Sequence, residues 1–366
     1  MLIKAAVTHE KNSDCIMEDV NLQDPQYGEV LVKIVASGIC HTDIGVQRQE
    51  KPVPLPIILG HEGSGIVEKV GEGVITFQPG DHVVMSYNSC GKCRHCLNGK
   101  GYGCERAYDV SFGGHMGDGT HRHYHNGQKV SVFFGQSSFA TYSIVSARNI
   151  VKVDKSIPLE LLGPLGCGIQ TGSGTIFNKL KPEVGSNLAV FGCGSVGLSA
   201  IMAARIAGCK IIIGIDVHEN RLTLAKELGA THVINGRDEN VIQRIIEITD
   251  GGIDYGVDTS GRPEVLRQAT DSLSIGGIVA LVGGSPTGTD VTLNMNKLVF
   301  EKTVTGVIQG HSIPQLFIPK LIDLYKQGIF PFDKLITFYE FKDINKAVEE
   351  MNNGTVLKPV LLMNES

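Results

Sequence analysis

The sequence contains no tryptophan, no run of basic residues and no apolar stretch longer than a strand. A membrane-spanning helix needs about 20 consecutive apolar residues, so we expect no membrane association. Lys and Arg total 33 against 38 Asp and Glu, a formal net charge of −5, and this balance does not favour a nucleic-acid partner. The first residues lack the basic and apolar segments of a secretion signal, so we expect a cytoplasmic protein.

The chain has 366 residues, of which 42% are hydrophobic and nine are cysteine. This length favours two domains with a cleft between them over one large core. In a reducing compartment, cysteines more often bind metals or take part in catalysis than form disulfides. Metal binding is therefore the first function to test for the cysteines.

The spacing of apolar residues changes along the chain. Short β-branched runs at 31–36, 65–70 and 82–85 predict a β-rich first part, and the Gly-, Cys- and His-rich stretch 90–134 predicts a loop. From 187 onward, apolar strands alternate with amphipathic helices, which predicts an α/β fold with a doubly wound parallel sheet. Helices are then expected at 319–327 and 344–351, before a final strand that ends near 362.

A glycine-rich turn separates the first of these strands from its helix. The turn consists of Gly192, Cys193, Gly194, Ser195, Val196 and Gly197. Its three glycines permit a tight turn, close approach of a pyrophosphate and packing of helix on strand. Asp216 ends the next strand, where its carboxylate would bind the ribose hydroxyls of NAD and repel the 2′-phosphate of NADP. Arg221 is either a second ribose contact or a solvated helix residue.

Four cysteines lie close together in the predicted loop: Cys90, Cys93, Cys96 and Cys104. Four thiolates around zinc form a closed tetrahedron with no position for a substrate, so we predict a structural zinc site. A disulfide pair or an iron–sulfur cluster is the alternative. Cys40, His61 and Cys167 are further candidates, but spacing alone does not join them, and a single Cys or His at a strand end is usually a packed core residue.

These segments together resemble the zinc-containing medium-chain alcohol dehydrogenases, and the resemblance covers nearly the whole chain. It implies that Cys40, His61 and Cys167 bind a catalytic zinc ion, whose fourth ligand is water or the alcohol oxygen. Asp43 matches the carboxylate that orients the zinc-binding imidazole. Glu62 matches a buried glutamate behind the metal.

The resemblance also assigns residues around the nicotinamide. Thr42 matches the residue that bonds the substrate oxygen and starts a proton relay through the nicotinamide ribose. Thr171 and Val282 match residues near the nicotinamide ring, and His41 stands where many relatives carry a pyrophosphate-binding arginine. The relay of many relatives ends at a histidine, but Gly45 occupies that position here. We therefore expect water to accept the proton.

The implied architecture is a GroES-like catalytic domain formed by residues 1–168 and 309–366, with a Rossmann NAD-binding domain at 169–308. The implied enzyme is an NAD-linked alcohol dehydrogenase with two zinc ions per chain, one catalytic and one structural. It transfers hydride between the nicotinamide and a primary alcohol or its aldehyde. A homo-oligomer, dimer or tetramer, is expected.

The segment 163–172, Gly45 and three nearby aromatic residues, Phe112, Phe133 and Phe139, look most like the aryl or benzyl alcohol branch of this family. The same phenylalanines are equally compatible with a core position. Allylic terpenoid alcohols such as geraniol, short aliphatic alcohols and the glutathione adduct of formaldehyde are alternative substrates. A zinc-free quinone-type reductase would lack the three zinc ligands, and a non-catalytic binding relative would be expected to have lost at least one.

Two smaller groups of residues, three histidines and three cysteines, lie outside these motifs. His121, His123 and His125 alternate in a way that suggests a third metal site, but we predict solvated histidines in an exposed loop. Cys15, Cys193 and Cys209 have no partner by motif and are predicted to be small, buried apolar residues.

Overall fold

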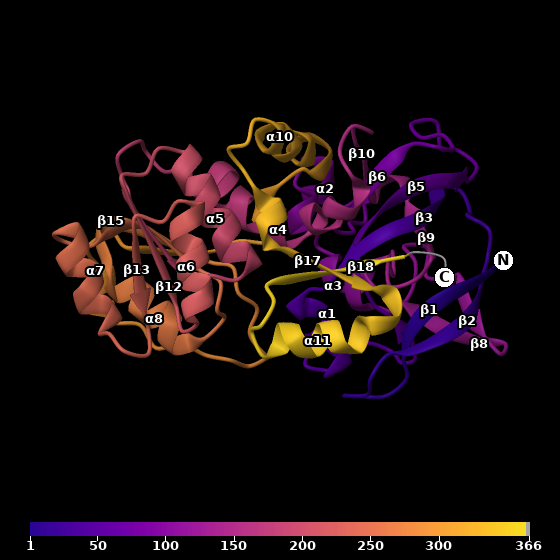
Figure 1. Cartoon of the computed structure of the whole chain (residues 1–366), viewed down its shortest axis with the longest axis horizontal. Coiled ribbons are helices and arrows are strands. Elements are labelled where there is room, and N and C mark those ends of the chain that lie inside the picture. The colour runs from indigo at the N-terminus through magenta and orange to yellow at the C-terminus, as the bar shows by residue number, and fades with distance from the viewer. Residues whose placement is uncertain (364–366) are drawn as a thin grey trace. The chain divides into compact units, whose positions relative to one another are not determined.

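The computed structural model describes residues 1–363, which form two compact units. Within the described residues, the first unit comprises 1–167, 313–320 and 333–363. The second comprises residues 168–312 and 321–332. Figure 1 shows strands of the N-terminal colours together with the C-terminal strands β17 and β18 in the first unit.

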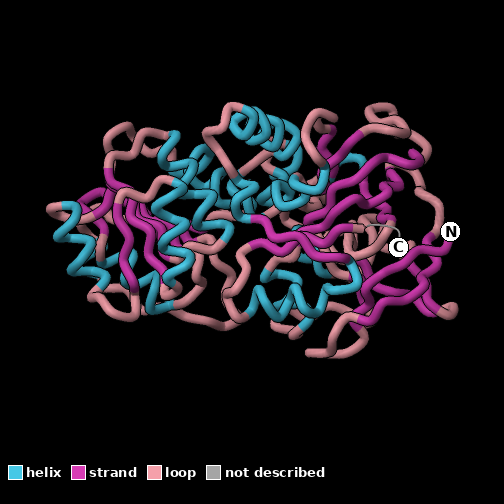
Figure 2. The backbone as a smooth tube through the Cα atoms, in the orientation of Figure 1, coloured by secondary structure: helices cyan, strands magenta, loops and turns pink. Residues whose placement is uncertain are grey.

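The first unit contains a small closed barrel and a larger sheet, and both are drawn as strands in Figure 2. The barrel strands, in order around the barrel, are β1 (Leu2–Thr8), β2 (Ile16–Leu22), β7 (His123–His125), β8 (Gln128–Val132) and β4 (Ile57–Ile58). The path through the seven-stranded sheet is β10 (Ile150–Lys152), β6 (His82–Met85), β5 (Glu62–Val70), β3 (Glu29–Gly38), β18 (Lys358–Leu362) and β17 (Ile336–Glu340), with β9 (Tyr142–Ser146) also paired to β3. One apolar core joins the barrel and the sheet.

Four helices belong to the first unit: α1 (His41–Gln47), α2 (Arg94–Leu97), α3 (Ala107–Phe112) and α11 (Ile344–Asn352). The prediction that 90–134 is entirely loop was wrong, because this stretch also contains β7 and β8. The two strands pair with each other, and β7 extends the barrel from β2. Pairing with distant strands thus overrides a local composition that lacks strand character.

The second unit is built on a six-stranded sheet in which all the strands are parallel. The spatial order is β13 (His232–Asn235), β12 (Ile211–Asp216), β11 (Asn187–Phe191), β14 (Ile253–Asp258), β15 (Leu273–Leu281) and β16 (Thr303–Gly306). The chain order therefore reverses between β11 and β14, and in such sheets ligands bind at the carboxyl ends of the strands next to the reversal.

Six helices accompany this sheet: α4 (Gly168–Gly174), α5 (Ser195–Ile206), α6 (Glu219–Leu228), α7 (Val241–Thr249), α8 (Pro263–Asp271) and α9 (Met295–Leu298). The predicted helix at 319–327 corresponds to α10 (Pro314–Lys326), which begins earlier than expected and contains Pro319 in its interior. Pro314 occupies the first helical position, where a missing N–H costs nothing. No helix within residues 1–363 has both the length and the apolar character needed to cross a membrane.

Candidate active site

Asp43 connects the start of α1 to His61. Its Oδ2 accepts a hydrogen bond from the backbone N–H of Cys40 (2.9 Å), the residue that caps α1. Its Oδ1 accepts from the N–H of Gly60 (2.9 Å) and lies 3.0 Å from Nδ1 of His61. A carboxylate can only accept, so Nδ1 carries the proton of the neutral ring, and Nε2 is the nitrogen left to bind a metal ion. Nε2 of His61 is buried and has no hydrogen-bond partner among the described residues, as expected for a metal-binding nitrogen.

Two glycines, Gly163 and Gly166, allow Cys167 to lie beside Cys40 and His61. Cys167 follows the 3₁₀ turn Gly163–Gly166, which lies against β5 and β6. A Cβ at Gly163 would collide with the carbonyl oxygen of Glu62, and one at Gly166 with that of Met85. The two glycines therefore permit a backbone approach that no other residue would allow.

One donor atom from each of Cys40, His61, Glu62 and Cys167 lies within 4.8 Å of all the others. The hydrogen bond from Cys167 holds the pKa of Cys40 well below its ordinary value and raises that of Cys167. Burial opposes a charged imidazole, but Asp43 and the Cys40 sulfur together raise the pKa of His61. The Cys40 sulfur and the Asp43 carboxylate thus place negative charge around His61. A divalent cation bound here would replace the protons that the cysteine and histidine side chains carry without it. Two sulfurs and one imidazole nitrogen are a donor set that suits zinc.

Lys358 on β18 also belongs to this site, although it was not predicted from the sequence. Its Nζ donates to both carboxylate oxygens of Glu62 (3.0 and 2.9 Å) and to the carbonyl oxygen of Ile39 (2.9 Å). Lys358 is 3% exposed and Glu62 is fully buried. Burial raises the pKa of Glu62 to about 7, against the opposing effect of the lysine. A charged residue within the apolar strand 358–362 was the only sequence signal for this pair.

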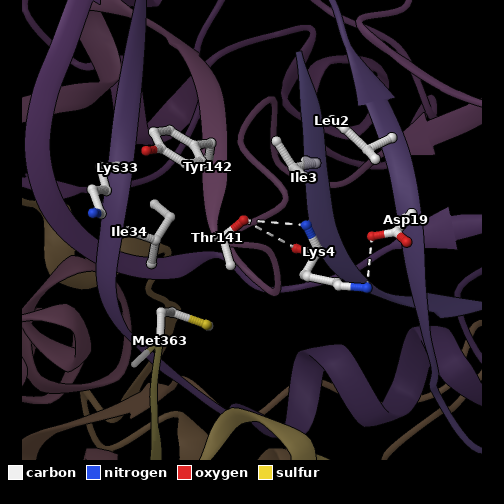
Figure 3. A pocket seen from close by; sticks show the side chains of 9 residues that line it. All are labelled: Leu2, Ile3, Lys4, Asp19, Lys33, Ile34, Thr141, Tyr142 and Met363. Atoms are coloured by element: carbon white, nitrogen blue, oxygen red, sulfur yellow. Dashed lines mark hydrogen bonds and ion pairs between the residues drawn. The ribbon is translucent and has the colours of Figure 1, made fainter. Parts of the chain in front are cut away.

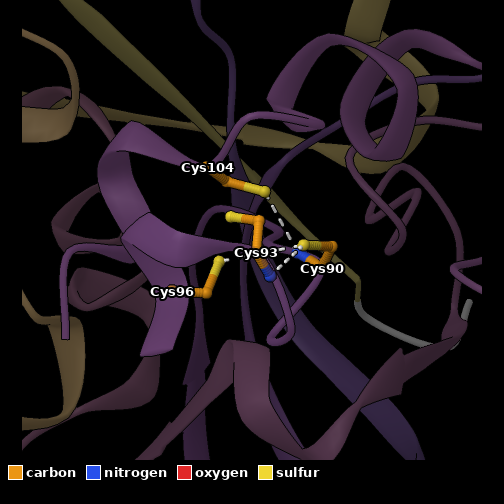
Figure 4. Close-up of side chains that lie close together, drawn as sticks. All are labelled: Cys90, Cys93, Cys96 and Cys104. Carbon is orange, nitrogen blue, oxygen red and sulfur yellow. Dashed lines mark hydrogen bonds between the residues drawn. The ribbon is translucent and has the colours of Figure 1, made fainter. Parts of the chain in front are cut away.

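The four-cysteine run forms a second cluster. Figure 4 shows the side chains of Cys90, Cys93, Cys96 and Cys104 turned toward one another, and their sulfur atoms all lie within 4.8 Å of each other. The backbone N–H of Cys90 donates to the Cys104 sulfur (3.3 Å), and that of Cys93 donates to the Cys90 sulfur (3.4 Å). None of the nine cysteines, all of which lie in the described part of the chain, forms a disulfide. Four thiols in this arrangement suit a closed tetrahedral metal site.

The glycine-rich turn of the second unit has the features of a pyrophosphate-binding loop. Gly192 directly follows β11 and adopts the left-handed region, with φ of 96°. A Cβ at Gly197 would collide with the carbonyl oxygen of Gly192, so only glycine lets α5 start this close to the strand. A Cβ at Gly194 would meet no atom within 4 Å. A phosphate could approach the backbone from this open side of Gly194. Ser195 and Val196 follow Gly194 in the first turn of α5.

Asp216 is the last residue of β12. Its Oδ2 accepts from the N–H of Cys193 (2.7 Å), and its Oδ1 accepts from those of Val217 (2.7 Å) and His218 (3.0 Å). The acid is thus fixed beside the glycine-rich turn. Arg221 is not a solvated helix residue: its side chain is 16% exposed, and its Nη1 lies 3.9 Å from Oδ2 of Asp216.

The remaining predicted cofactor residues lie in both units. In the second unit, Thr171 is in α4 and Val282 directly follows β15, with its N–H bonded to the carbonyl oxygen of Asp258 (2.8 Å). In the first unit, His41 and Thr42 begin α1. Oγ1 of Thr42 is half-buried and lies 3.7 Å from the sulfur of Cys40, so this hydroxyl borders the candidate metal site.

The aromatic residues beside His61 differ in part from the prediction. Phe133 and Phe139 are buried in the core, whereas Phe112 is half-buried. Phe134, which sequence analysis did not single out, stacks on the His61 ring with centroids 4.6 Å apart and contacts Phe112 at 5.3 Å. Phe112 and Phe134 therefore form the aromatic surface next to the candidate metal ligands.

The prediction of solvated histidines at 121–125 was wrong for His123. This residue is fully buried because it lies opposite Leu22 in the β2–β7 pair and shares its inward face. Within residues 1–363, neither ring nitrogen of His123 has a hydrogen-bond partner, and the two metal-type clusters found do not include His121, His123 or His125. Of the three cysteines predicted to be buried, Cys15 and Cys193 are buried, but Cys209 is only half-buried.

A shallow pocket of the first unit contains none of the predicted site residues. Its lining side chains, labelled in Figure 3, come mainly from β1, β2, β3 and β9, and Lys4 pairs with Asp19 at 2.7 Å. Lys4 also bonds Thr141 through its backbone N–H (3.2 Å). Lys4, Asp19 and Thr141 therefore have partners within the protein, and none of the zinc-ligand candidates lies in this pocket.

The sulfur-rich centres in a β-rich unit, together with a doubly wound sheet that carries a glycine-rich turn, define a zinc-binding dehydrogenase. Residues 26–155 match the model of the alcohol dehydrogenase GroES-like domain, and residues 195–327 match that of the zinc-binding dehydrogenases. The chain belongs to the zinc-containing medium-chain alcohol dehydrogenase family. The predicted family and fold class are thereby confirmed.

Three relatives span almost the whole chain. Geraniol dehydrogenase of Castellaniella defragrans is 43% identical over 98% of this chain and 97% of its own. The crystal structure of benzyl alcohol dehydrogenase from Acinetobacter calcoaceticus superposes with a TM-score of 0.97 at 47% identity, covering all of both chains. An alcohol dehydrogenase zinc-binding domain protein from Burkholderia ambifaria superposes with a TM-score of 0.98 at 45% identity, again over both full chains.

Proposed function

We propose that this enzyme is an NAD-linked, zinc-dependent alcohol dehydrogenase that oxidises primary alcohols, preferentially aryl or benzyl alcohols, to aldehydes. The observation that carries the proposal is the convergence of Cys40, Cys167 and the unpartnered Nε2 of His61 next to the hydroxyl of Thr42. Zinc bound by these three residues would act as a Lewis acid toward the alcohol oxygen.

The protein's own groups then hold the substrate and move its proton. Asp43 keeps the His61 ring in one orientation and one tautomer. The Thr42 hydroxyl can accept a proton from the alcohol while it donates its own onward. Phe134, which stacks on His61, and Phe112, which contacts Phe134, would form an apolar wall that excludes water from the bound substrate.

The four thiols of Cys90, Cys93, Cys96 and Cys104 would hold a second zinc ion, so we propose two per chain. Because cysteines are kept reduced in the cytoplasm and are then available as ligands, the proposal includes a cytoplasmic location. NAD is the proposed cofactor, since Asp216 would repel a 2′-phosphate. Arg221 beside it would lessen this repulsion, so both dinucleotides have to be tested.

The aromatic pair supports an aryl substrate, as does the similarity to a benzyl alcohol dehydrogenase. A flat ring can pack against Phe112 and Phe134 in offset or edge-to-face geometry. Allylic alcohols are the second candidate, because the relative from Castellaniella is a geraniol dehydrogenase and an allylic double bond is also flat.

A steady-state panel of benzylic, allylic and linear primary alcohols with NAD and NADP, alongside zinc stoichiometry, tests the proposal. We expect the highest kcat/KM for a benzylic alcohol with NAD, and about two zinc ions per chain. Cys40→Ala, His61→Ala and Cys167→Ala should each remove one zinc ion and nearly all turnover. Unchanged turnover in these variants would show a zinc-independent enzyme instead, and no turnover in the wild type would show a non-catalytic relative.

We also propose a homo-oligomer. The edge strand β16 of the second unit pairs on one side only, with β15. Large apolar side chains are exposed in the segments near it: Ile275 (74%), Met295 (82%), Val299 (75%) and Phe300 (55%). Exposed apolar groups at a free strand edge favour association. Light scattering at micromolar concentration tests this, and a monomeric mass would refute it.

A further inference from the structure

Glu50 is held against Gly45 by the backbone at the end of α1. The N–H of Glu50 donates to the carbonyl oxygen of Gly45 (2.9 Å), and that of Gln49 donates to Val46 (2.8 Å). Gln49 adopts left-handed backbone with φ of 53°. These are the bonds of a Schellman motif, which folds the second residue after a helix back onto its last turn. The place of Glu50 is therefore fixed by main-chain geometry.

The carboxylate fills the space beside Gly45. A Cβ at Gly45 would lie 3.4 Å from Oε2 of Glu50. Thr42 lies three residues before Gly45 in α1, so both are on one face of the helix, about 5–6 Å apart. Thr42 borders the candidate metal site, and Glu50 is exposed to solvent. The face of α1 that carries Thr42 and Gly45 thus extends from the candidate metal site to Glu50, which contacts bulk water.

We propose that Glu50 is the proton acceptor that completes the relay from Thr42. It would take the role of the histidine that many relatives carry where this chain has Gly45. The inference rests on the proposed alcohol dehydrogenase activity. Oxidation of the alcohol sends a hydride to the nicotinamide and one proton out of the site. That proton passes from the alcohol to the Thr42 hydroxyl, across one intervening hydroxyl or water, and onto the Glu50 carboxylate. The carboxylic acid then releases it to solvent, so Glu50 replaces unassisted water as the acceptor.

In the described part of the chain, the charged residues near Glu50 do not form an ion pair with its carboxylate. His41 and Arg48 belong to the two ends of α1, and Lys51 follows Glu50 directly. The ammonium group of Lys51 lies over the Phe112 ring, 5.5 Å from its centroid. Within residues 1–363, the structure shows no ion pair that engages the Glu50 carboxylate, which is therefore available to take up a proton.

Glu50→Gln tests the proposal, because it removes the acceptor and keeps the side-chain size and the backbone N–H of the Schellman motif. We expect kcat for alcohol oxidation to fall at least about 10-fold below pH 7 and to approach the wild-type value at high pH, where hydroxide takes over. Imidazole buffer should restore the low-pH rate. Glu72→Gln, an exposed glutamate in the turn after β5, is the matched control and should leave the profile unchanged.

A second readout does not depend on turnover. Mixing enzyme and NAD with trifluoroethanol, a very poor hydride donor, should release a proton that a pH-indicator dye detects, and Glu50→Gln should slow that release. An unchanged pH profile would overturn the role of Glu50, as would an equal loss at every pH that imidazole does not rescue. Either result in a variant that still oxidises alcohols leaves the proposed function standing. An inactive wild-type enzyme would refute the proposed function itself.

Discussion

Replacing Lys358 with methionine should destabilise the first unit strongly. The substitution keeps most of the side-chain volume but removes the ammonium group that serves both Glu62 oxygens and the Ile39 carbonyl. A carboxylate that is fully buried would then lose its counter-ion. Breaking such a pair from one side costs about 3–5 kcal/mol, because the remaining charge stays desolvated. With a urea m-value of about 3 kcal/mol per M, the unfolding midpoint should fall by about 1 M or more.

The assay is urea unfolding of zinc-saturated protein, followed by circular dichroism, with Lys4→Met as the matched control. Lys4 forms an equally short ion pair with Asp19 (2.7 Å), but the two side chains are 61% and 49% exposed. An exposed pair contributes about 0–1 kcal/mol, so this variant should unfold close to wild type. A double variant, Lys358→Met with Glu62→Gln, should recover most of the loss. If Lys358→Met and Lys4→Met behaved alike, the reasoning would be refuted.

Three further predictions concern other parts of the chain. Burial lowers the pKa of His123 to about 4 from 6.5. The unfolded chain therefore takes up a proton first as the pH falls, and the wild type should lose about 3 kcal/mol of stability between pH 6.5 and 4. His123→Leu should avoid this loss and exposed His232→Gln should not, as measured by unfolding free energy against pH. Asp216→Gly should raise the NADP-to-NAD ratio of kcat/KM at least about 100-fold, with Arg221 nearby to bind the phosphate; an unchanged ratio would place Asp216 away from the ribose. Chelation of zinc should expose residues 90–104 to protease before the rest of the chain, and unaltered cleavage would contradict a metal-ordered loop.

The features best predicted from the sequence are those encoded within one short segment. The parallel sheet follows from the alternation of strands and helices, and the turn at Gly192 and the run from Cys90 to Cys104 carry their geometry in their spacing. Cys40, His61 and Cys167 are far apart in the chain, so only the family resemblance could join them before the fold was known. Their roles as zinc ligands stay predictions that metal analysis can test.

The features that were not predicted from the sequence depend on contacts between distant segments. Lys358 pairs with Glu62, which lies 296 residues away in the sequence, and no local pattern predicts that pair. Phe134 was missed because its stacking on His61 depends on how β8 and the residues after it return to the site. His123 looked like a loop residue because barrel closure, rather than its neighbours in sequence, decides which way it faces.

Asp43 sets a limit on how this centre can change. The same two oxygens anchor the first turn of a helix, a loop backbone and an imidazole. A substitution aimed only at the affinity for metal would also loosen the Gly60 segment and fray the helix that carries Thr42. Directed evolution of this enzyme should therefore tolerate changes in the substrate wall far more readily than at Asp43, and variants selected for a different metal should retain this carboxylate.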